Sequence, residues 1–300
     1  MVVSKMNNMN QSALALVTVL YHSNDVLDEF FESLAKQKNC EYKIFIVDNS
    51  ETDSSREICL SYIEKYNINA EYIFNDENVG VAKGNNIGIR LGLLQGFEKI
   101  LLLNNDITFE GDLFSDLLLQ STLYSEKIFI PKIYYHGTNT LWMAGGHYNK
   151  WTSLTPHRGD GEDDNGQYNQ SDIVNYAPTC FMLIDASIFD TVGLMDEKYF
   201  VYYDDTDFIF RCIHAGFFIR YLPSLMVNHK VSALTGGNTS LFSIYYTNRN
   251  RIYFILKNVH CIYKLTNLFY YFSSRLLVMV KATSSVRAKI KSAVLDGLRM

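Results

Sequence analysis

Four apolar runs of strand length, separated by segments with helical periodicity, limit the possible fold of this chain more than any other feature. The apolar runs lie at residues 14–21, 42–47, 70–74 and 99–103. Helical patterns fill the stretches between them, at residues 27–34, 52–66 and 81–96. Continuously apolar strands that alternate with helices are typical of a parallel sheet buried on both faces. The sequence therefore predicts an α/β fold with helices on both sides of a mostly parallel sheet.

Polar side chains gather where three of these predicted strands end. They occupy residues 22–25, 48–50 and 104–106. In open α/β sheets the ligand lies outside the carboxyl ends of the strands, where the connecting loops meet. We therefore expect a binding cleft at this edge of the sheet.

The regular alternation weakens after Asp106. Residues 112–124 and 186–192 are predicted to be helical, and residues 127–135, 173–185, 218–222 and 225–227 to be extended. The polar segment 136–172 contains Asp160, Asp163 and Asp164, which resemble a calcium loop only faintly because the alternating ligand spacing is missing, so a solvated loop is expected. Residues 142–146 either line an acceptor groove or pack. This part is expected to build the second half of the cleft.

Charge and cysteine content favour an intracellular, folded protein. Five cysteines are scattered without a pair at metal or redox spacing, and the first twelve residues lack the apolar run of a signal peptide. The net charge is −5, but from Leu241 onward ten Lys or Arg face a single acid, Asp296. The body is thus acidic and the tail basic. No nucleic-acid partner is expected.

Three carboxylates, Asp204, Asp205 and Asp207, crowd among aromatic residues at positions 199–208. Like charges at this spacing repel, and burial raises their pKa values, so the cluster costs stability unless a cation, a helix terminus or a reaction uses it. One interpretation is that Asp204 and Asp205 cap a helix, with Asp207 paired to Arg211 one turn on. The other is that the cluster contains a catalytic acid or base.

Two further motifs have compositions suited to a nucleotide. Residues 104–106 (Asn-Asn-Asp) follow a buried strand, where Asp106 can hold a divalent cation together with diphosphate oxygens, or can simply end the strand in a turn. Residues 78–88 place glycines, amides and Lys83 at a helix start, which suits close approach of a phosphate or base. Glycines for tight helix packing would explain part of this second pattern.

Taken in order, these motifs resemble the inverting glycosyltransferases of family two, in particular the rhamnosyltransferase-like branch. The matching segments are residues 47–50, 78–88, 102–106, 192–197 and 199–211, followed by His229. The resemblance covers roughly residues 13–255 and implies a Rossmann-like GT-A fold, a sugar nucleotide donor, a divalent metal (Mg²⁺ or Mn²⁺) and inversion at the anomeric carbon. It places the catalytic domain at residues 13–240, with the nucleotide-binding half ending near Asp106.

The same resemblance implies roles for individual residues. Asp205 would be the general base and Asp204 a supporting acid, while Asp106 and His229 would hold the metal. Asn104 replaces the first aspartate of the family's DXD motif, so metal binding would depend more on Asp106 and the donor. Asp48 would read the pyrimidine base. The remaining residues implied in donor binding are Asn78, Gly80, Lys83, Asn85, Asn86, Asn104 and Asn105.

The resemblance implies transfer of rhamnose from dTDP-rhamnose to a lipid-linked surface polysaccharide precursor of O-antigen or capsule type. Donors such as UDP-galactofuranose or another UDP-hexose are the alternative within this class. A sugar-phosphate nucleotidyltransferase would use a similar nucleotide-binding half, but the glycine-rich, basic loop expected after its first strand is missing. A non-catalytic sugar-binding module is the third possibility.

The basic tail, residues 241–300, is predicted to be helical. Aromatic residues and bases alternate up to Lys264, and residues 265–280 are apolar apart from Arg275. These stretches are shorter than the roughly 20 apolar residues that span a bilayer. Either the tail lies on an anionic membrane surface, which would place a cytoplasmic enzyme at the inner face beside a polyprenyl-linked acceptor, or it packs on the catalytic domain. Arg249 and Arg251 are alternatively available to a diphosphate.

Overall fold

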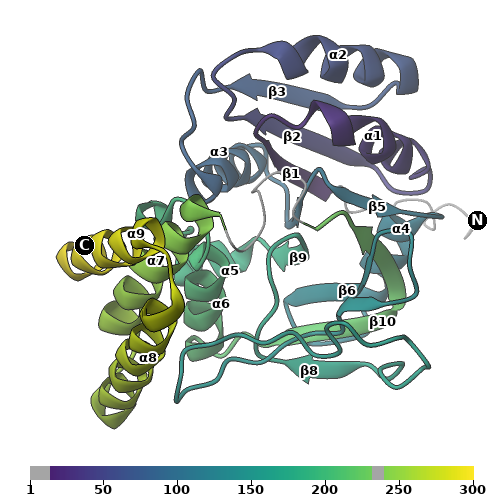
Figure 1. Cartoon of the computed structure of the whole chain (residues 1–300). Helices are drawn as coiled ribbons and strands as arrows, with labels where there is room; N and C mark the ends of the chain where they lie inside the picture. The colour runs from purple at the N-terminus through teal and green to yellow at the C-terminus, as the bar shows by residue number, and fades with distance from the viewer. Residues whose placement is uncertain (1–13, 232–239) are drawn as a thin grey trace, which may run out of the picture.

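The computed structural model describes residues 14–231 and 240–300, and its first half is the predicted alternation of strands and helices (Figure 1). Four parallel strands lie in the order β3-β2-β1-β4, and β1 pairs with both β2 and β4. The elements are β1 (Leu14–Leu20), η1 (Asn24–Val26), α1 (Leu27–Ala35), β2 (Tyr42–Asp48), α2 (Ser54–Tyr66), β3 (Ala70–Phe74), α3 (Val81–Leu94) and β4 (Lys99–Leu103).

The second half continues the same sheet with mixed strand directions. The full order is β3-β2-β1-β4-β9-β6-β10-β5, and β9 lies antiparallel between β4 and β6. Its elements are β5 (Ile107–Phe109), α4 (Leu113–Ser121), β6 (Ile128–Tyr135), β7 (Leu141–Met143), β8 (Asp172–Val174), β9 (Phe181–Asp185), α5 (Ser187–Val192), η2 (Glu197–Tyr199), α6 (Asp204–His214) and β10 (Ile219–His229).

Two predicted strand boundaries in this half are wrong. The extended segment 173–185 is two strands, β8 and β9, because the chain between them turns from the edge of the sheet to its centre. The two short segments 218–222 and 225–227 form the single strand β10, which pairs with β6 on either side of an irregularity between Leu222 and Met226.

Helix α3 approaches β1 unusually closely because glycines line the face that touches the strand. A Cβ added at Gly84 would lie 2.9 Å from Val19, one at Gly88 2.4 Å from Val17, and one at Gly92 3.0 Å from Ala15. The sequence prediction that some glycines of this segment serve packing is confirmed. The connections from β1 to β2 and from β2 to β3 move in one direction along the sheet, whereas the connection from β3 to β4 moves back across it. Because such connections are right-handed, α3 lies on the face of the sheet opposite α1 and α2.

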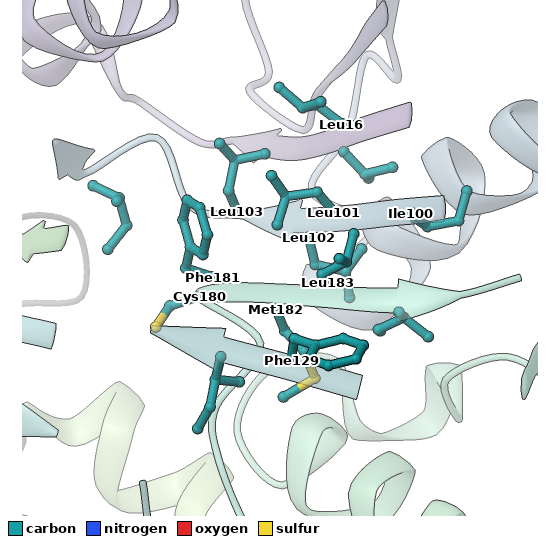
Figure 2. Packing of buried hydrophobic residues seen from close by; sticks show 14 of the residues in the cluster. Leu16, Ile100, Leu101, Leu102, Leu103, Phe129, Cys180, Phe181, Met182 and Leu183 are labelled. Atoms are coloured by element: carbon teal, nitrogen blue, oxygen red, sulfur yellow. The ribbon is translucent and has the colours of Figure 1, made fainter. Parts of the chain in front are cut away.

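The main core fills the space around the centre of the sheet. Figure 2 shows side chains of β1, β4, β9 and β6 packed against one another, among them Leu16, Leu101, Phe181 and Phe129. All four of these side chains are essentially inaccessible to solvent. This continuous apolar centre fixes the strand ends that carry the polar clusters.

The tail consists of three helices that lie beside α5 and α6 (Figure 1). They are α7 (Leu241–Asn258), α8 (Cys261–Lys281) and α9 (Ser284–Arg299), so the predicted helical character is confirmed. A second apolar cluster joins α7 and α8 to the body through Tyr199, Phe254 and Tyr271. Helix α7 also touches α9 closely, because a Cβ on Gly297 would lie 2.4 Å from the carbonyl oxygen of Arg249.

Candidate functional site

A cavity of about 520 Å³ opens at the carboxyl ends of β1 and β4 and gathers most of the predicted donor-binding residues. Seven predicted residues line it: Asn78, Gly80, Asn85, Asn104, Asn105, Asp106 and His229. Its apolar wall includes Val19, Phe200, Val201 and Phe242. The last of these belongs to α7, so the tail contributes to the same cavity as the nucleotide-binding half.

Asp106 and His229 are neighbours because β5 and β10 pair antiparallel, which sets His229 opposite Ile107. Nε2 of His229 lies 3.2 Å from Oδ1 of Asp106, and both side chains are about nine-tenths buried. Neither Oδ1 of Asp106 nor Nδ1 of His229 has a hydrogen-bond partner among the described residues. Buried polar atoms without partners are rare in folded proteins, so this pair fits a cation or a polar ligand atom.

The donor set at this position is small. In residues 14–231 and 240–300, no group of three or more His, Cys, Asp or Glu side chains gathers to hold a metal. A cation here would thus take two protein ligands, Asp106 and His229, and complete its shell with water or phosphate oxygens. Mg²⁺ is commonly bound in this way, through one or two carboxylates plus substrate phosphates.

Asparagine side chains hold the loops around the cavity together. The amide of Asn105 donates to the carbonyl of Val19 at 3.1 Å and to Oγ of Ser23 at 2.9 Å, which ties the end of β4 to that of β1. Asn49 donates to the carbonyl of Gly80 at 3.0 Å and accepts from Asn75 at 2.7 Å. These bonds fix the strand-end loops before any ligand arrives.

Five of the predicted residues do not line the cavity: Asp48, Lys83, Asn86, Asp204 and Asp205. The buried carboxylate of Asp48 accepts from the hydroxyl of Tyr72 at 2.5 Å and from the amide of Ser50 at 2.8 Å. Asn86 holds the segment before η2, exchanging hydrogen bonds with the backbone of Met195. The structure therefore gives Asp48 and Asn86 protein partners.

Asp204 and Asp205 begin α6 without a cationic partner among the described residues. Burial, with the charge of Asp205 second, raises the pKa of Asp204 to about 8. Burial also raises the pKa of Asp205, although hydrogen bonds from Tyr176 and Thr206 oppose this. Its Oδ1 accepts from the amide of Thr206 at 2.6 Å, which is a local helix-start interaction. A raised pKa places a carboxylate close to the pH at which it can exchange protons.

Asp207, in the same helical turn, is fully compensated. Its completely buried carboxylate accepts from Arg211 Nε at 2.8 Å, so the predicted pairing one turn on is confirmed. It also accepts from Lys257 Nζ at 2.8 Å, from Asn258 at 2.7 Å and from the hydroxyl of Tyr199 at 3.2 Å. The basic tail thus neutralises this acid.

Sequence reasoning missed Tyr176, whose hydroxyl donates to Oδ2 of Asp205 at 3.0 Å. Beyond it lies a chain of rings: His157 stacks on Tyr176, and Trp142 contacts both His157 and His229 edge to face. This chain connects the acid pair to Asp106 and His229. No sequence signal marks Tyr176 as functional, because it lies inside the segment 173–185, whose pattern indicates only an extended backbone.

The guanidinium groups of Arg249 and Arg251 donate hydrogen bonds to backbone carbonyls. Arg249 donates to the carbonyls of Lys198 and Tyr199, at 2.9 and 2.7 Å, and the buried Arg251 donates to that of Thr152 at 2.6 Å. Both residues hold α7 against the body in this structure, and neither lines the cavity.

A cavity at the strand ends of an α/β sheet, with the buried Asp106 and His229 in its wall, fits the class of nucleotide-dependent transferases. The acid pair without a cation begins α6, outside the cavity lining. The family model for glycosyl transferase family 2 matches residues 15–193. The chain belongs to this family and is a glycosyltransferase.

Two relatives at low sequence identity are also named as sugar transferases. The chain is 24% identical over 274 residues to the dTDP-rhamnosyl transferase RfbF of Shigella flexneri, covering 88% of each protein. It is 25% identical over 244 residues to the low-salt glycan biosynthesis hexosyltransferase Agl10 of Haloferax volcanii, covering 79% of this chain and 74% of the relative.

Solved structures confirm the GT-A fold. TarS of S. aureus (residues 1–349) superposes with a TM-score of 0.61 at 15% identity, covering 96% of this chain and 80% of that one. GalNAc-T7, solved with UDP, GalNAc and Mn²⁺, superposes with a TM-score of 0.65 at 15% identity, covering 95% of this chain and 55% of that one. At this identity the likeness concerns the fold alone.

Proposed function

We propose that this glycosyltransferase transfers rhamnose, with inversion, from dTDP-rhamnose to a lipid-linked precursor of a surface polysaccharide, in a metal-dependent reaction. The observation that carries the proposal is the presence of two unlike acidic centres, one in the cavity wall and one at the start of α6. Asp106 and His229 each have a buried atom without a hydrogen-bond partner among the described residues, whereas Asp204 and Asp205 are separated from the cavity-lining residues 200–202 only by Tyr203. The similarity to a dTDP-rhamnosyl transferase supports the choice of donor.

On the donor side, Asp106 and His229 hold a divalent cation and the asparagines at the strand ends contact the nucleotide. When bound, the cation neutralises negative charge that builds on the leaving diphosphate. Asn78, Asn85 and Asn104 offer amide donors and acceptors to the phosphates and ribose from the cavity wall. Asn105 offers only its amide oxygen, because its nitrogen donates to Val19 and Ser23. Reading of the base by Asp48 stays a prediction, and Asn49 next to it lines the cavity.

On the acceptor side, Asp205 takes the proton from the acceptor hydroxyl as its oxygen attacks the anomeric carbon opposite the leaving diphosphate. Burial raises the pKa of Asp205, which strengthens it as a base. Tyr176 holds Oδ2 of Asp205, and Asp204 contacts or orients the acceptor. Burial, and after it the negative charges of Asp106 and Asp205, raise the pKa of the Cys180 thiol, so both carboxylates lie within electrostatic reach of one buried side chain.

A panel of sugar nucleotides tests donor and class together. The purified protein is incubated with dTDP-rhamnose, UDP-galactofuranose and other UDP-hexoses, and the released nucleoside diphosphate is measured. We expect acceptor-dependent release of dTDP, its loss with a chelator, and its return with Mg²⁺ or Mn²⁺. Release of UDP alone would replace rhamnose by another hexose. Diphosphate release from a nucleoside triphosphate plus a sugar phosphate would overturn the proposal in favour of a nucleotidyltransferase.

We further propose that the outer face of α8 lies on an anionic membrane beside the lipid-linked acceptor. Phe269 is 76% exposed, and four other large apolar residues at spacings of three or four share its side of the helix: Ile262, Leu265, Phe272 and Leu276. Asn267 and Tyr271 face the body instead. An apolar helix face flanked by exposed bases such as Lys281 and Arg287 suits a headgroup boundary.

The described part of the chain contains no helix both long and apolar enough to cross a bilayer. A test therefore concerns surface binding, and point changes are preferable to truncation because α9 packs against α7. We expect Leu265→Ser with Phe269→Ser to abolish flotation with vesicles containing phosphatidylglycerol. The matched control is Leu119→Ser with Leu123→Ser. These two leucines are similarly exposed, one on α4 and one just after it, and this variant is expected to float like the wild type. Unchanged flotation of the α8 variant would contradict the membrane role.

A further inference from the structure

The loop at residues 199–203 connects the cavity to the acid pair and has an unusual backbone. Phe200, Val201 and Tyr202 line the cavity, and α6 begins directly after Tyr203. Phe200, Tyr202 and Tyr203 have φ values of 69°, 63° and 65°. Bulky residues with a Cβ rarely adopt this left-handed region, so contacts from outside the loop must hold its shape.

Asn250 of α7 provides those contacts. Its side-chain amide nitrogen lies 2.8 Å from the carbonyl oxygen of Tyr199, 2.7 Å from that of Val201 and 2.8 Å from that of Tyr202. Asn250 is completely buried, and its oxygen accepts from Nε of Arg249 at 2.8 Å. Three carbonyl oxygens around one atom require a donor, so the nitrogen must face the loop.

The same loop also holds the start of α3 on the donor side of the cavity. The carbonyl oxygen of Phe200 accepts from the amides of Val81 at 2.6 Å and Ala82 at 3.4 Å, and so satisfies free N–H groups at the helix start. A Cβ at Gly80 would lie only 2.5 Å from the ring of Phe200. A shift of the loop would therefore move both the start of α3 and the start of α6.

We propose that Asn250 is a positioning residue that sets the acid pair relative to the donor cavity through this loop. The inference rests on the proposed function only in taking Asp205 as the base. It assigns the tail a part in catalysis in addition to its proposed membrane contact. Asn250 touches neither the cavity nor the acids, and its effect on the reaction is transmitted by the three carbonyls that it holds.

Asn248, two residues earlier on α7, provides a matched control. It is also buried, but its oxygen accepts from the hydroxyl of Tyr271 at 3.1 Å and from Arg275 at 3.3 Å, both on α8. Its amide nitrogen donates within α7, to the carbonyl of Ile244. Asn248 thus joins two tail helices, whereas Asn250 joins the tail to the loop.

The experiment compares Asn250→Asp with Asn248→Asp. At position 250 the substitution turns an oxygen toward three carbonyl oxygens of the loop. At position 248 it keeps the acceptor that faces Tyr271 and Arg275 and loses only the bond to Ile244 within α7, away from the loop. We expect Asn250→Asp to lower kcat by about 100-fold, because a misplacement of about 1 Å at a reaction centre costs that much. In the Asn250→Asp variant, the backbone amides of Val81 and Ala82 should exchange hydrogen faster than in the wild type. Asn248→Asp should stay close to the wild type in both measurements.

A second variant, Asn250→Ser, keeps a small donor and guards against loss of folding in Asn250→Asp. The pH profile separates positioning from stability: a loosened loop hydrates the acid pair, lowers its pKa and moves the acidic limb of kcat to lower pH. Folded Asn250 variants with wild-type kcat and pH profile would overturn the proposal. If Asp205→Asn stays active while the Asn250 variants still speed hydrogen exchange at Val81 and Ala82, Asn250 does hold the loop but Asp205 is not the base.

Discussion

Two acidic clusters in this protein, residues 204–207 at the start of α6 and residues 160–164 in the loop between β7 and β8, are treated in opposite ways. In the loop, Asp164 accepts hydrogen bonds from Lys132 Nζ at 2.7 Å and from the hydroxyl of Tyr134. Burial alone would raise the pKa of Asp164, but the bonds from Lys132 and Tyr134 outweigh it and lower the pKa to about 2. The loop expected to be solvated thus has a buried ion pair at its centre.

At α6 the protein compensates one acid and leaves two without a cation. Asp207 receives Arg211 and Lys257, whereas Asp204 and Asp205 have no Lys or Arg partner in the described part of the chain. The region does not lack positive charge, because Arg211 and Lys257 both bond to Asp207. The difference makes buried carboxylates without a cation more specific candidates for a functional position than a high density of acids.

The largest expected effect comes from Asp205→Asn. If Asp205 is the general base, kcat should fall by about 10²- to 10⁴-fold, the usual contribution of such a group. Folding should be preserved, because burial disfavours the ionised form and the substitution removes that charge. Turnover is measured with the preferred donor, and thermal melting serves as the control. Wild-type turnover in a folded variant would leave helix capping as the role of Asp205.

The converse is expected for Asp164→Asn, which should affect stability and leave turnover intact. Lys132 is 1% exposed, so the substitution leaves an ammonium group buried without a counter-charge. Breaking one side of a buried ion pair costs about 3–5 kcal/mol. Urea unfolding measures the loss, and kcat of the remaining folded protein is the control. A loss of turnover without a loss of stability would break the contrast between the clusters.

The two clusters should also give stability opposite dependences on pH. Asp204, with its pKa raised to about 8, binds its proton more tightly in the folded state, so its contribution to stability falls as pH rises from about 4 to 8. For Asp164, lowered to about 2, the contribution is present above about pH 4 and is lost as pH falls toward 2. The unfolding free energies of both Asn variants are measured across this range. Asp204→Asn should lack the fall in stability between about pH 4 and 8, and Asp164→Asn should lack the fall from about pH 4 toward 2. Slopes equal to the wild type in both variants would contradict these assignments.

Local patterns in the sequence were sufficient for the first half of the fold and for part of the site. The apolar runs at β1 to β4 predicted the parallel sheet, and the spacing of Asp207 and Arg211 predicted their ion pair. Strand-end position likewise predicted that Asn104, Asn105 and Asp106 would line one cavity.

What the sequence could not predict depends on contacts between distant segments. The pairing of β9 between β4 and β6 joins strands about 80 and 55 residues apart, and periodicity contains no information on such partners. The same holds for the bond from Tyr176 to Asp205, for the ion pair of Lys132 with Asp164, and for Asn250 on its loop. Each of these residues has an ordinary sequence neighbourhood, so only the folded chain reveals its role.

The smallest expected effect, from Asp163→Asn, sharpens the comparison inside one loop. Asp163 is exposed and accepts a hydrogen bond from the hydroxyl of Thr140 at 3.2 Å, which an asparagine oxygen also accepts. Surface substitutions of this kind change stability by about 0.5 kcal/mol or less. Urea unfolding of Asp163→Asn beside Asp164→Asn should therefore separate two adjacent aspartates by several kcal/mol. Similar losses in both would mean that the charge of the loop as a whole, and not the buried pair of Asp164 with Lys132, stabilises it.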